Sequence, residues 1–222
     1  TDTARIAAIT QAFDAMPALY IADGHHRSAA ASRVAAARHQ QGREQSADAF
    51  LSVIFPHHQM KILDYNRVVR DLHGLEKSAL VTRLATAFAV EDSPGQVHPA
   101  RPGEFGMYLA GHWHRLGIKP ELIPDDPVAS LDVSLLSDHL LAPILGIADL
   151  RRDKRIDFVG GIRGLAELEK RVDSGEMAVA FALHPTRMDQ LMAVADSNNV
   201  MPPKSTWFEP KLADGLVSHL LD

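Results

Sequence analysis

The sequence predicts a mixed α+β fold, and three observations lead to that prediction. Segments with helical spacing of apolar residues alternate along the chain with short runs of β-branched and aromatic residues. Two neighbouring segments, 105–109 and 113–118, alternate in the manner of a β-hairpin. The 222 residues, of which 46% are hydrophobic and 23% charged, are enough for one large or two small domains with an apolar core.

The N-terminal quarter of the chain predicts a helix, a strand, a second helix and a second strand. Ile6, Ile9 and Phe13 have helical spacing within 4–16, and Pro17 ends that helix. The remaining elements are an apolar strand at 19–22, an alanine-rich helix at 28–40, a polar loop at 41–48 and a β-branched and aromatic strand at 50–55.

The middle and the C-terminal part continue the alternation of strands and helices. The further strands are expected at 60–69 (bent at 64–66), 88–90, 105–109, 113–118, 156–159 and 177–183, with a last one entered from the loop 201–208. The further helices are expected at 75–87, 134–145, 165–172 and 188–196. Because 121–129 is an acidic connector that contains prolines, we expect two parts, 1–120 and 121–222.

Composition excludes several classes of protein. The net charge is −5, so the chain lacks the global basic field of most nucleic-acid binders, and no nucleic-acid partner is expected. No run of about 18 apolar residues occurs, so no membrane span is expected. The absence of cysteine excludes disulfides and thiolate metal sites and fits a cytoplasmic location.

The strongest candidate for a site is the turn Asp-Gly-His-His-Arg at 23–27, between an expected strand and an expected helix. The first amides of a helix have no intrahelical partner, and together with the helix dipole they attract anions. Gly24 permits a positive φ and a close approach of a ligand, while His25, His26 and Arg27 can donate to phosphate oxygens. Each of these residues alone is more often structural, but the cluster favours a phosphate-binding turn.

Two later segments are weaker candidates for the same chemistry. Gly160–Gly164 joins a strand to a helix and carries Arg163, although its glycines are equally well explained by tight helix–sheet packing. Pro-Pro-Lys-Ser-Thr at 202–206 places Lys204 and two hydroxyls after a rigid turn. The glycines that a P-loop requires upstream are missing, so this is no Walker motif, but Lys204 remains a candidate phosphate or substrate contact.

Twelve histidines raise the question of a metal site. The pairs His25-His26 and His57-His58 are adjacent in sequence, and adjacent side chains diverge in helices and strands, so they chelate one ion poorly. His112 and His114 share a strand face, but the sequence offers no third ligand. We expect no structural zinc; a Mg²⁺ ion carried by nucleotide phosphates would need few protein groups, such as Asp23.

Five blocks of the sequence, which extend over nearly the whole chain, resemble one family of bacterial and archaeal proteins. That family is described as a domain of unknown function and is similar to the free-serine kinases of the ParB/sulfiredoxin superfamily. The blocks begin at Tyr20, Ile62, Asp132, Asp153 and Met201. The resemblance implies a ParB/sulfiredoxin-like nucleotide-binding core followed by a C-terminal α/β subdomain.

The resemblance also implies an activity. In that superfamily a turn at a helix N-terminus holds nucleotide phosphates, and characterised relatives transfer a phosphoryl group from ADP or ATP to the hydroxyl of free serine. We therefore expect a small-molecule phosphotransferase that uses ADP or ATP with Mg²⁺ and a small hydroxyl-bearing metabolite. The expected catalytic residues are Asp23, His25 and His26. The expected cofactor-binding residues are Gly24, Arg27, Arg163, Lys204, Ser205 and Thr206.

One departure from the kinases limits this expectation. The acidic residue that acts as the base in the kinases lies upstream of the phosphate turn, where this chain has only Asp2 and Asp14, neither in a recognisable motif. We expect the chain to lack an upstream half that carries the base. The alternative is a nucleotide-binding regulatory module without turnover, and a DNA-associated role is disfavoured by the net charge.

Overall fold

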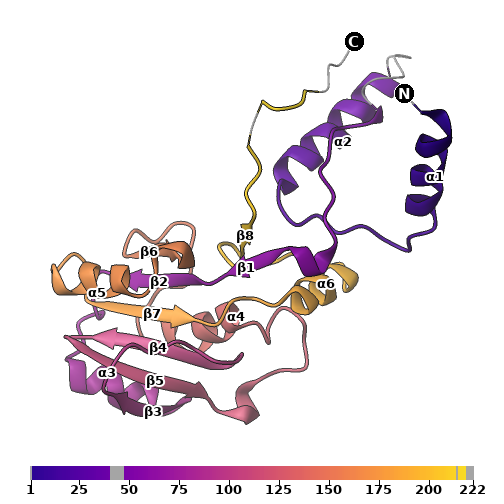
Figure 1. Cartoon of the computed structure of the whole chain (residues 1–222). Coiled ribbons are helices and arrows are strands. Elements are labelled where there is room, and N and C mark those ends of the chain that lie inside the picture. The colour runs from indigo at the N-terminus through magenta and orange to yellow at the C-terminus, as the bar shows by residue number, and fades with distance from the viewer. Residues whose placement is uncertain (1, 41–47, 214, 219–222) are drawn as a thin grey trace. The chain divides into compact units, whose positions relative to one another are not determined.

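The computed structural model of the chain describes residues 2–40, 48–213 and 215–218 (Figure 1). The chain divides into two compact units. Unit 1 comprises Thr1–Ile54 and Leu212–Asp222, and unit 2 comprises Phe55–Lys211. The fold is α+β, as the sequence predicts.

The described part of unit 1 contains two α-helices, α1 (Thr3–Asp14) and α2 (His25–His39), whose residues are all at least partly exposed. The Asp2 carboxylate caps α1 by accepting hydrogen bonds from the Ala4 and Arg5 amides at 3.1 and 3.2 Å. The helix predicted over 4–16 is therefore confirmed. The second helix begins at His25, three residues before the predicted start at 28.

The two strands predicted in unit 1 do not form. Residues 19–22 and 50–55 have no regular structure, and Leu19 and Val53 expose 59% and 56% of their surface. Strands need a neighbour to satisfy their backbone N–H and C=O groups, and the described part of unit 1 contains no strand to pair with them. Most of the loop predicted at 41–48 lies outside the described residues.

Unit 2 is built on a six-stranded sheet and a separate two-stranded sheet. The strands are β1 (Lys61–Leu63), β2 (Tyr65–Val69), β3 (Phe88–Ser93), β4 (Glu104–Leu109), β5 (His112–Ile118), β6 (Ile156–Gly160), β7 (Val179–Leu183) and β8 (Trp207–Glu209). Each strand lies antiparallel to its neighbours, in the order β3-β5-β4-β7-β2-β6 for the large sheet and β1-β8 for the small one. The predicted bend of 60–69 is the break at Asp64, which divides that run between the two sheets.

The pairing of strands explains why the chain does not divide at residue 120. β7 lies between β4 and β2, so the large sheet joins strands from both sides of that position. The connector at 121–129 is thus a loop within unit 2, and the division lies between Ile54 and Phe55 and between Lys211 and Leu212. A shared hydrogen-bond ladder outweighs the local composition that suggested parts 1–120 and 121–222.

Unit 2 contains four α-helices in addition to its strands. They are α3 (Lys77–Leu84), α4 (Asp132–Leu136), α5 (Ala166–Asp173) and α6 (Met188–Asp196). The segment η4 (Ser137–Leu141) continues α4 as a π-helix, so the helix predicted over 134–145 begins two residues earlier and changes its winding. The 3₁₀ turns are η2 (His57–Gln59), η3 (Pro120–Leu122) and η5 (Gly161–Arg163).

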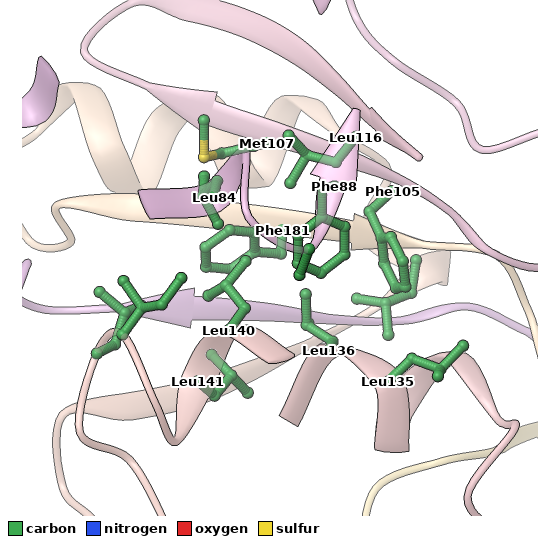
Figure 2. Packing of buried hydrophobic residues seen from close by; sticks show 14 of the residues in the cluster. Leu84, Phe88, Phe105, Met107, Leu116, Leu135, Leu136, Leu140, Leu141 and Phe181 are labelled. Carbon is green, nitrogen blue, oxygen red and sulfur yellow. The ribbon is translucent and has the colours of Figure 1, made fainter. Parts of the chain in front are cut away.

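The large sheet has a core on each face. One core packs Val69, Met107 and Phe181 of the sheet against leucines of α3, α4 and η4, such as Leu84 and Leu136 (Figure 2). The other, smaller core packs the opposite face against α5. Alternate residues of one strand enter the two cores, as the period of two requires: Val68 faces α5, whereas Val69 faces the larger core.

Candidate functional site

The turn at 23–27 leaves three amides of α2 without partners. Gly24 precedes the helix with a left-handed φ of +86°, and its carbonyl accepts from the Ser28 amide at 2.9 Å. The amides of His25, His26 and Arg27 make no hydrogen bond to any residue that the structure describes. Because α2 runs for 15 residues, its dipole adds positive potential at this end.

The side chains of the turn are arranged around Gly24. The Asp23 carboxylate accepts from the Gly24 amide at 2.7 Å, which fixes the entry to the helix. A Cβ atom built on Gly24 would lie 3.3 Å from Nη2 and 3.4 Å from Nε of Arg27. The Arg27 guanidinium is therefore folded against the Gly24 backbone, beside the unpartnered amides, while His25 and His26 are exposed. The turn presents amide and guanidinium donors together.

The glycines at 160 and 161 have a packing role. A Cβ on Gly160 would lie 2.6 Å from Cε3 of Trp207, and one on Gly161 would overlap the carboxylate of Asp64. The Gly161 amide donates to the Asp64 carbonyl at 2.8 Å. These contacts favour the packing explanation of the two glycines. Arg163 is exposed and forms no ion pair within the described part of the chain.

The segment 202–206 is a turn whose carbonyls are bonded to the body of unit 2. Nη2 of Arg67 donates to the Lys204 carbonyl at 3.0 Å, and the Thr186 hydroxyl donates to the Ser205 carbonyl at 3.0 Å. The Ser205 hydroxyl donates to the Pro202 carbonyl at 2.5 Å. Lys204 has a left-handed φ of +58°, which is uncommon for a residue with a Cβ.

Arg67, which sequence reasoning missed, is fully buried on β2. Its guanidinium donates to the Tyr65 and Lys204 carbonyls and lies 5.3 Å from the centre of the Phe158 ring, while its Nε has no partner. Burial lowers the pKa of Arg67 to about 9. The available signal was an arginine within the predicted strand 60–69, because arginines are rarely buried.

Asp132 is a second buried ionisable residue. It begins α4 with 8% of its surface exposed, and its Oδ1 accepts from the Gly103 amide at 2.8 Å. Its Oδ2 has no partner within the described residues. Burial raises the pKa of Asp132 to about 7, with the Gly103 amide opposing that shift.

The predicted site residues fall into separate groups. Asp23 to Arg27 belong to unit 1, whereas Arg163 and 204–206 belong to unit 2. Within unit 2, the turn at 204–206 meets Arg67 and Thr186, and Thr186 also lines a pocket of about 230 Å³ next to β1 and the start of α6.

The described residues contain no group of three His, Cys, Asp or Glu residues placed to hold a metal ion. His114 instead pairs with Asp92 at 2.8 Å across β3 and β5. No helix in the described part of the chain is long and apolar enough to cross a membrane.

The fold defines a two-unit α+β protein, and comparison with known proteins gives its family. The model of the family described as "Protein of unknown function (DUF1015)" matches residues 1–134, more than half of the chain. The chain belongs to the DUF1015 family. No curated protein matches it.

Solved structures with low sequence identity are similar to the chain. A free serine kinase in complex with AMP matches at 17% identity and a TM-score of 0.47, over 85% of this chain and 66% of the kinase chain. A mutant of the free serine kinase in complex with ADP matches at 18% identity and a TM-score of 0.44. A conserved hypothetical protein from Pyrococcus furiosus matches at 17% identity and a TM-score of 0.45, over 85% of this chain and 68% of that one. The chain thus spans about two thirds of the length of these structures.

Proposed function

We propose that the chain binds the phosphates of ADP or ATP at the turn 23–27 and transfers a phosphoryl group to a hydroxyl of a small metabolite. The observation that carries this proposal is the juxtaposition of three unpartnered amides at the start of α2 with the Arg27 guanidinium. Phosphoryl transfer requires positioning and neutralisation of charge, which amides and a guanidinium supply. The sequence blocks resemble a family that is similar to the free-serine kinases, and this resemblance suggests adenine nucleotides, with serine as the first acceptor to test.

The roles of the residues follow from their chemistry. Arg27 and the amides of the first helical turn neutralise the charge of the β-phosphate. His25 or His26 donates to the transferred group. Asp23, which already accepts from the Gly24 amide, holds either the acceptor hydroxyl or the nucleotide-bound Mg²⁺. One carboxylate suits an ion that is otherwise held by phosphate oxygens and water, and the ion would neutralise phosphate charge.

Nucleotide binding without turnover is the second candidate, and an observation on Asp2 favours it. Of the two acidic residues upstream of the turn, Asp2 uses its carboxylate to cap α1. That leaves Asp14, at the C-terminal end of α1, as the remaining upstream acid. If neither carboxylate acts as a base, the protein would bind the nucleotide without transferring its phosphoryl group.

Calorimetric titration with ADP, ATP, CTP and AMP in the presence of Mg²⁺ tests the proposal. Arg27→Ala should weaken binding of the preferred nucleotide at least tenfold, because it removes a charge-assisted hydrogen bond. Arg33→Ala, which changes an exposed arginine of the same helix, should leave the affinity unchanged. Equal affinity of wild type and Arg27→Ala would contradict the proposal that the nucleotide phosphates bind at this turn.

Conversion of the nucleotide separates the two candidates. A phosphotransferase forms AMP from ADP, or ADP from ATP, only when an acceptor such as serine is present. Binding that is lost in Arg27→Ala, with no conversion in the presence of any acceptor, would support the regulatory module and contradict the enzyme.

A further inference from the structure

We infer that the turn 202–206 of unit 2 is a second, separate binding site for an oxyanion, a phosphate or a carboxylate, whose donors are the Lys204 ammonium and the amides of residues 204–206. This inference does not depend on the turn 23–27 of unit 1. It rests on the direction of the hydrogen bonds around the turn, on a buried cation behind it and on the strained backbone of Lys204.

In this turn the backbone carbonyls form hydrogen bonds, whereas the backbone amides do not form any with the described residues. The carbonyls of Pro202, Lys204 and Ser205 each accept a hydrogen bond from a side chain. The amides of Lys204, Ser205 and Thr206 make none with any described residue. A turn whose carbonyls are engaged and whose amides are free presents the positive ends of its peptide dipoles, which is the arrangement of anion-binding backbone nests.

Two positively charged side chains at the turn, Arg67 and Lys204, also favour an anion there. Arg67 is 0% exposed, bonds only to carbonyls and lies directly behind the turn. Within the described residues neither Arg67 nor Lys204 forms an ion pair; the Lys204 ammonium instead lies 5.6 Å from the centre of the Tyr65 ring. The carboxylate of Glu209, on β8, is occupied by the Trp207 indole N–H at 2.9 Å and the Lys211 amide at 3.2 Å. A bound oxyanion would supply the counter-charge that the protein does not.

The backbone of Lys204 is held in an unfavourable conformation. A left-handed conformation is unfavourable for a residue with a Cβ, and such strain persists where surrounding contacts fix it. Here Arg67 holds the Lys204 carbonyl, so Arg67 is the positioning residue that turns the adjoining amides outward. The buried guanidinium thus serves the site both through its charge and through its hydrogen bond.

Amide resonances of the full chain, labelled with ¹⁵N and carrying Arg27→Ala, test the inference directly. The Arg27→Ala background weakens any binding at 23–27, so failure of that turn and failure of this one are distinguishable. Titration with inorganic phosphate in one arm and acetate in the other should move the amide resonances of residues 204–206 downfield and to saturation. Saturation with phosphate alone or with acetate alone would assign the oxyanion to that class. No saturable shift of these amides with either ion would overturn the site.

Three variants complete the experiment. Lys204→Gln should weaken the binding of the ion at least fivefold, whereas Lys154→Gln, at an exposed lysine elsewhere in unit 2, should not change it. Equal affinity of Lys204→Gln and wild type would contradict the role of the ammonium. Arg67→Lys keeps the charge but cannot reach both carbonyls with the same geometry, and it should weaken binding while circular dichroism shows an intact fold. If Arg67→Lys does not fold, the amide shifts of residues 204–206 and the affinity of Lys204→Gln still test the oxyanion site.

Discussion

The two units contain helices with similar apolar spacing but very different burial. In α1 of unit 1, Ile6 and Ile9 expose 53% and 52% of their surface. In α3 of unit 2, Leu80 and Leu84 are 0% exposed, because they pack against the six-stranded sheet. An amphipathic pattern therefore specifies a helix and the face that could be buried, but not whether a partner for that face is present.

The strands show the same contrast more sharply. A helix satisfies its own backbone groups, so α1 forms without apolar burial, whereas a strand depends on a neighbour. The strands predicted at 105–109 and 113–118 pair with each other and are confirmed. The equally apolar segments 19–22 and 50–55, which belong to unit 1 except for Phe55, have no such partner among the described residues and stay irregular.

The largest expected effect contrasts the burial of apolar residues in the two units. Phe181→Ala empties a fully buried position of β7 and should lower the free energy of unfolding by about 3–5 kcal/mol. Ile9→Ala, at a half-exposed position of α1, should change it by about 0.5 kcal/mol or less. Urea unfolding monitored by circular dichroism measures both variants. A loss of more than about 1 kcal/mol in the free energy of unfolding of Ile9→Ala would mean that the apolar face of α1 is buried in solution. That result would contradict the difference in burial between the two units.

The second-largest expected effect is a pH dependence of stability in unit 2, which buries the carboxylate of Asp132 as well as apolar residues. The folded pKa of Asp132, about 7, lies above its usual value of 3.8, so the folded state binds the proton more tightly than the unfolded state. Asp132 therefore contributes stability below about pH 4, and that contribution is lost as the pH rises to about 7. The difference between 3.8 and about 7 corresponds to a loss of about 4 kcal/mol across this pH range.

Thermal unfolding between pH 4 and 8 measures this dependence, with Asp132→Asn as the matched variant. The amide oxygen of an asparagine can still accept from the Gly103 amide, so the variant should fold and should lack the decline between pH 4 and 7. Identical pH profiles for the two proteins would contradict the assignment to Asp132.

The smallest effect concerns unit 1, where α1 depends on local interactions rather than on apolar burial. Asp2→Ala removes the cap of α1 and should cost about 1 kcal/mol of helix stability. Hydrogen exchange at the Ala4 and Arg5 amides should then be about fivefold faster. Asp2→Asn keeps an acceptor at the cap and should restore most of the protection; unchanged exchange in Asp2→Ala would show that the cap contributes nothing.

Local signals in the sequence predict most of the elements, but not how they assemble. The helix at 188–196 has the predicted bounds, and the break in 60–69 falls at Asp64, the first residue of the predicted bend 64–66. The division of the chain was not predictable from the connector at 121–129, because β7 enters the sheet between β4 and β2 through contacts distant in sequence. The π-helical turn after α4 had no signal in the sequence that we recognised.

For the candidate sites too, local conformation could be predicted from the sequence, but contacts with distant residues could not. Gly24 was expected from the sequence to permit a positive φ, and the structure has φ +86° there. Lys204 was chosen for its charge, but the contact that fixes it comes from Arg67, 137 residues earlier in the chain. Local conformational demands can be inferred from a sequence, whereas a partner that arrives through strand pairing cannot.

The order of strands has a consequence for the behaviour of the protein at high concentration. The large sheet ends in β3 on one side and β6 on the other, and the outer edge of such a strand is where a strand of another chain could pair. β3 carries Glu91 and Asp92, and β6 carries Asp157, which pairs with Arg171 at 2.8 Å. Charges on both outermost strands oppose edge-to-edge aggregation, so the sheet resists growth by addition of further chains.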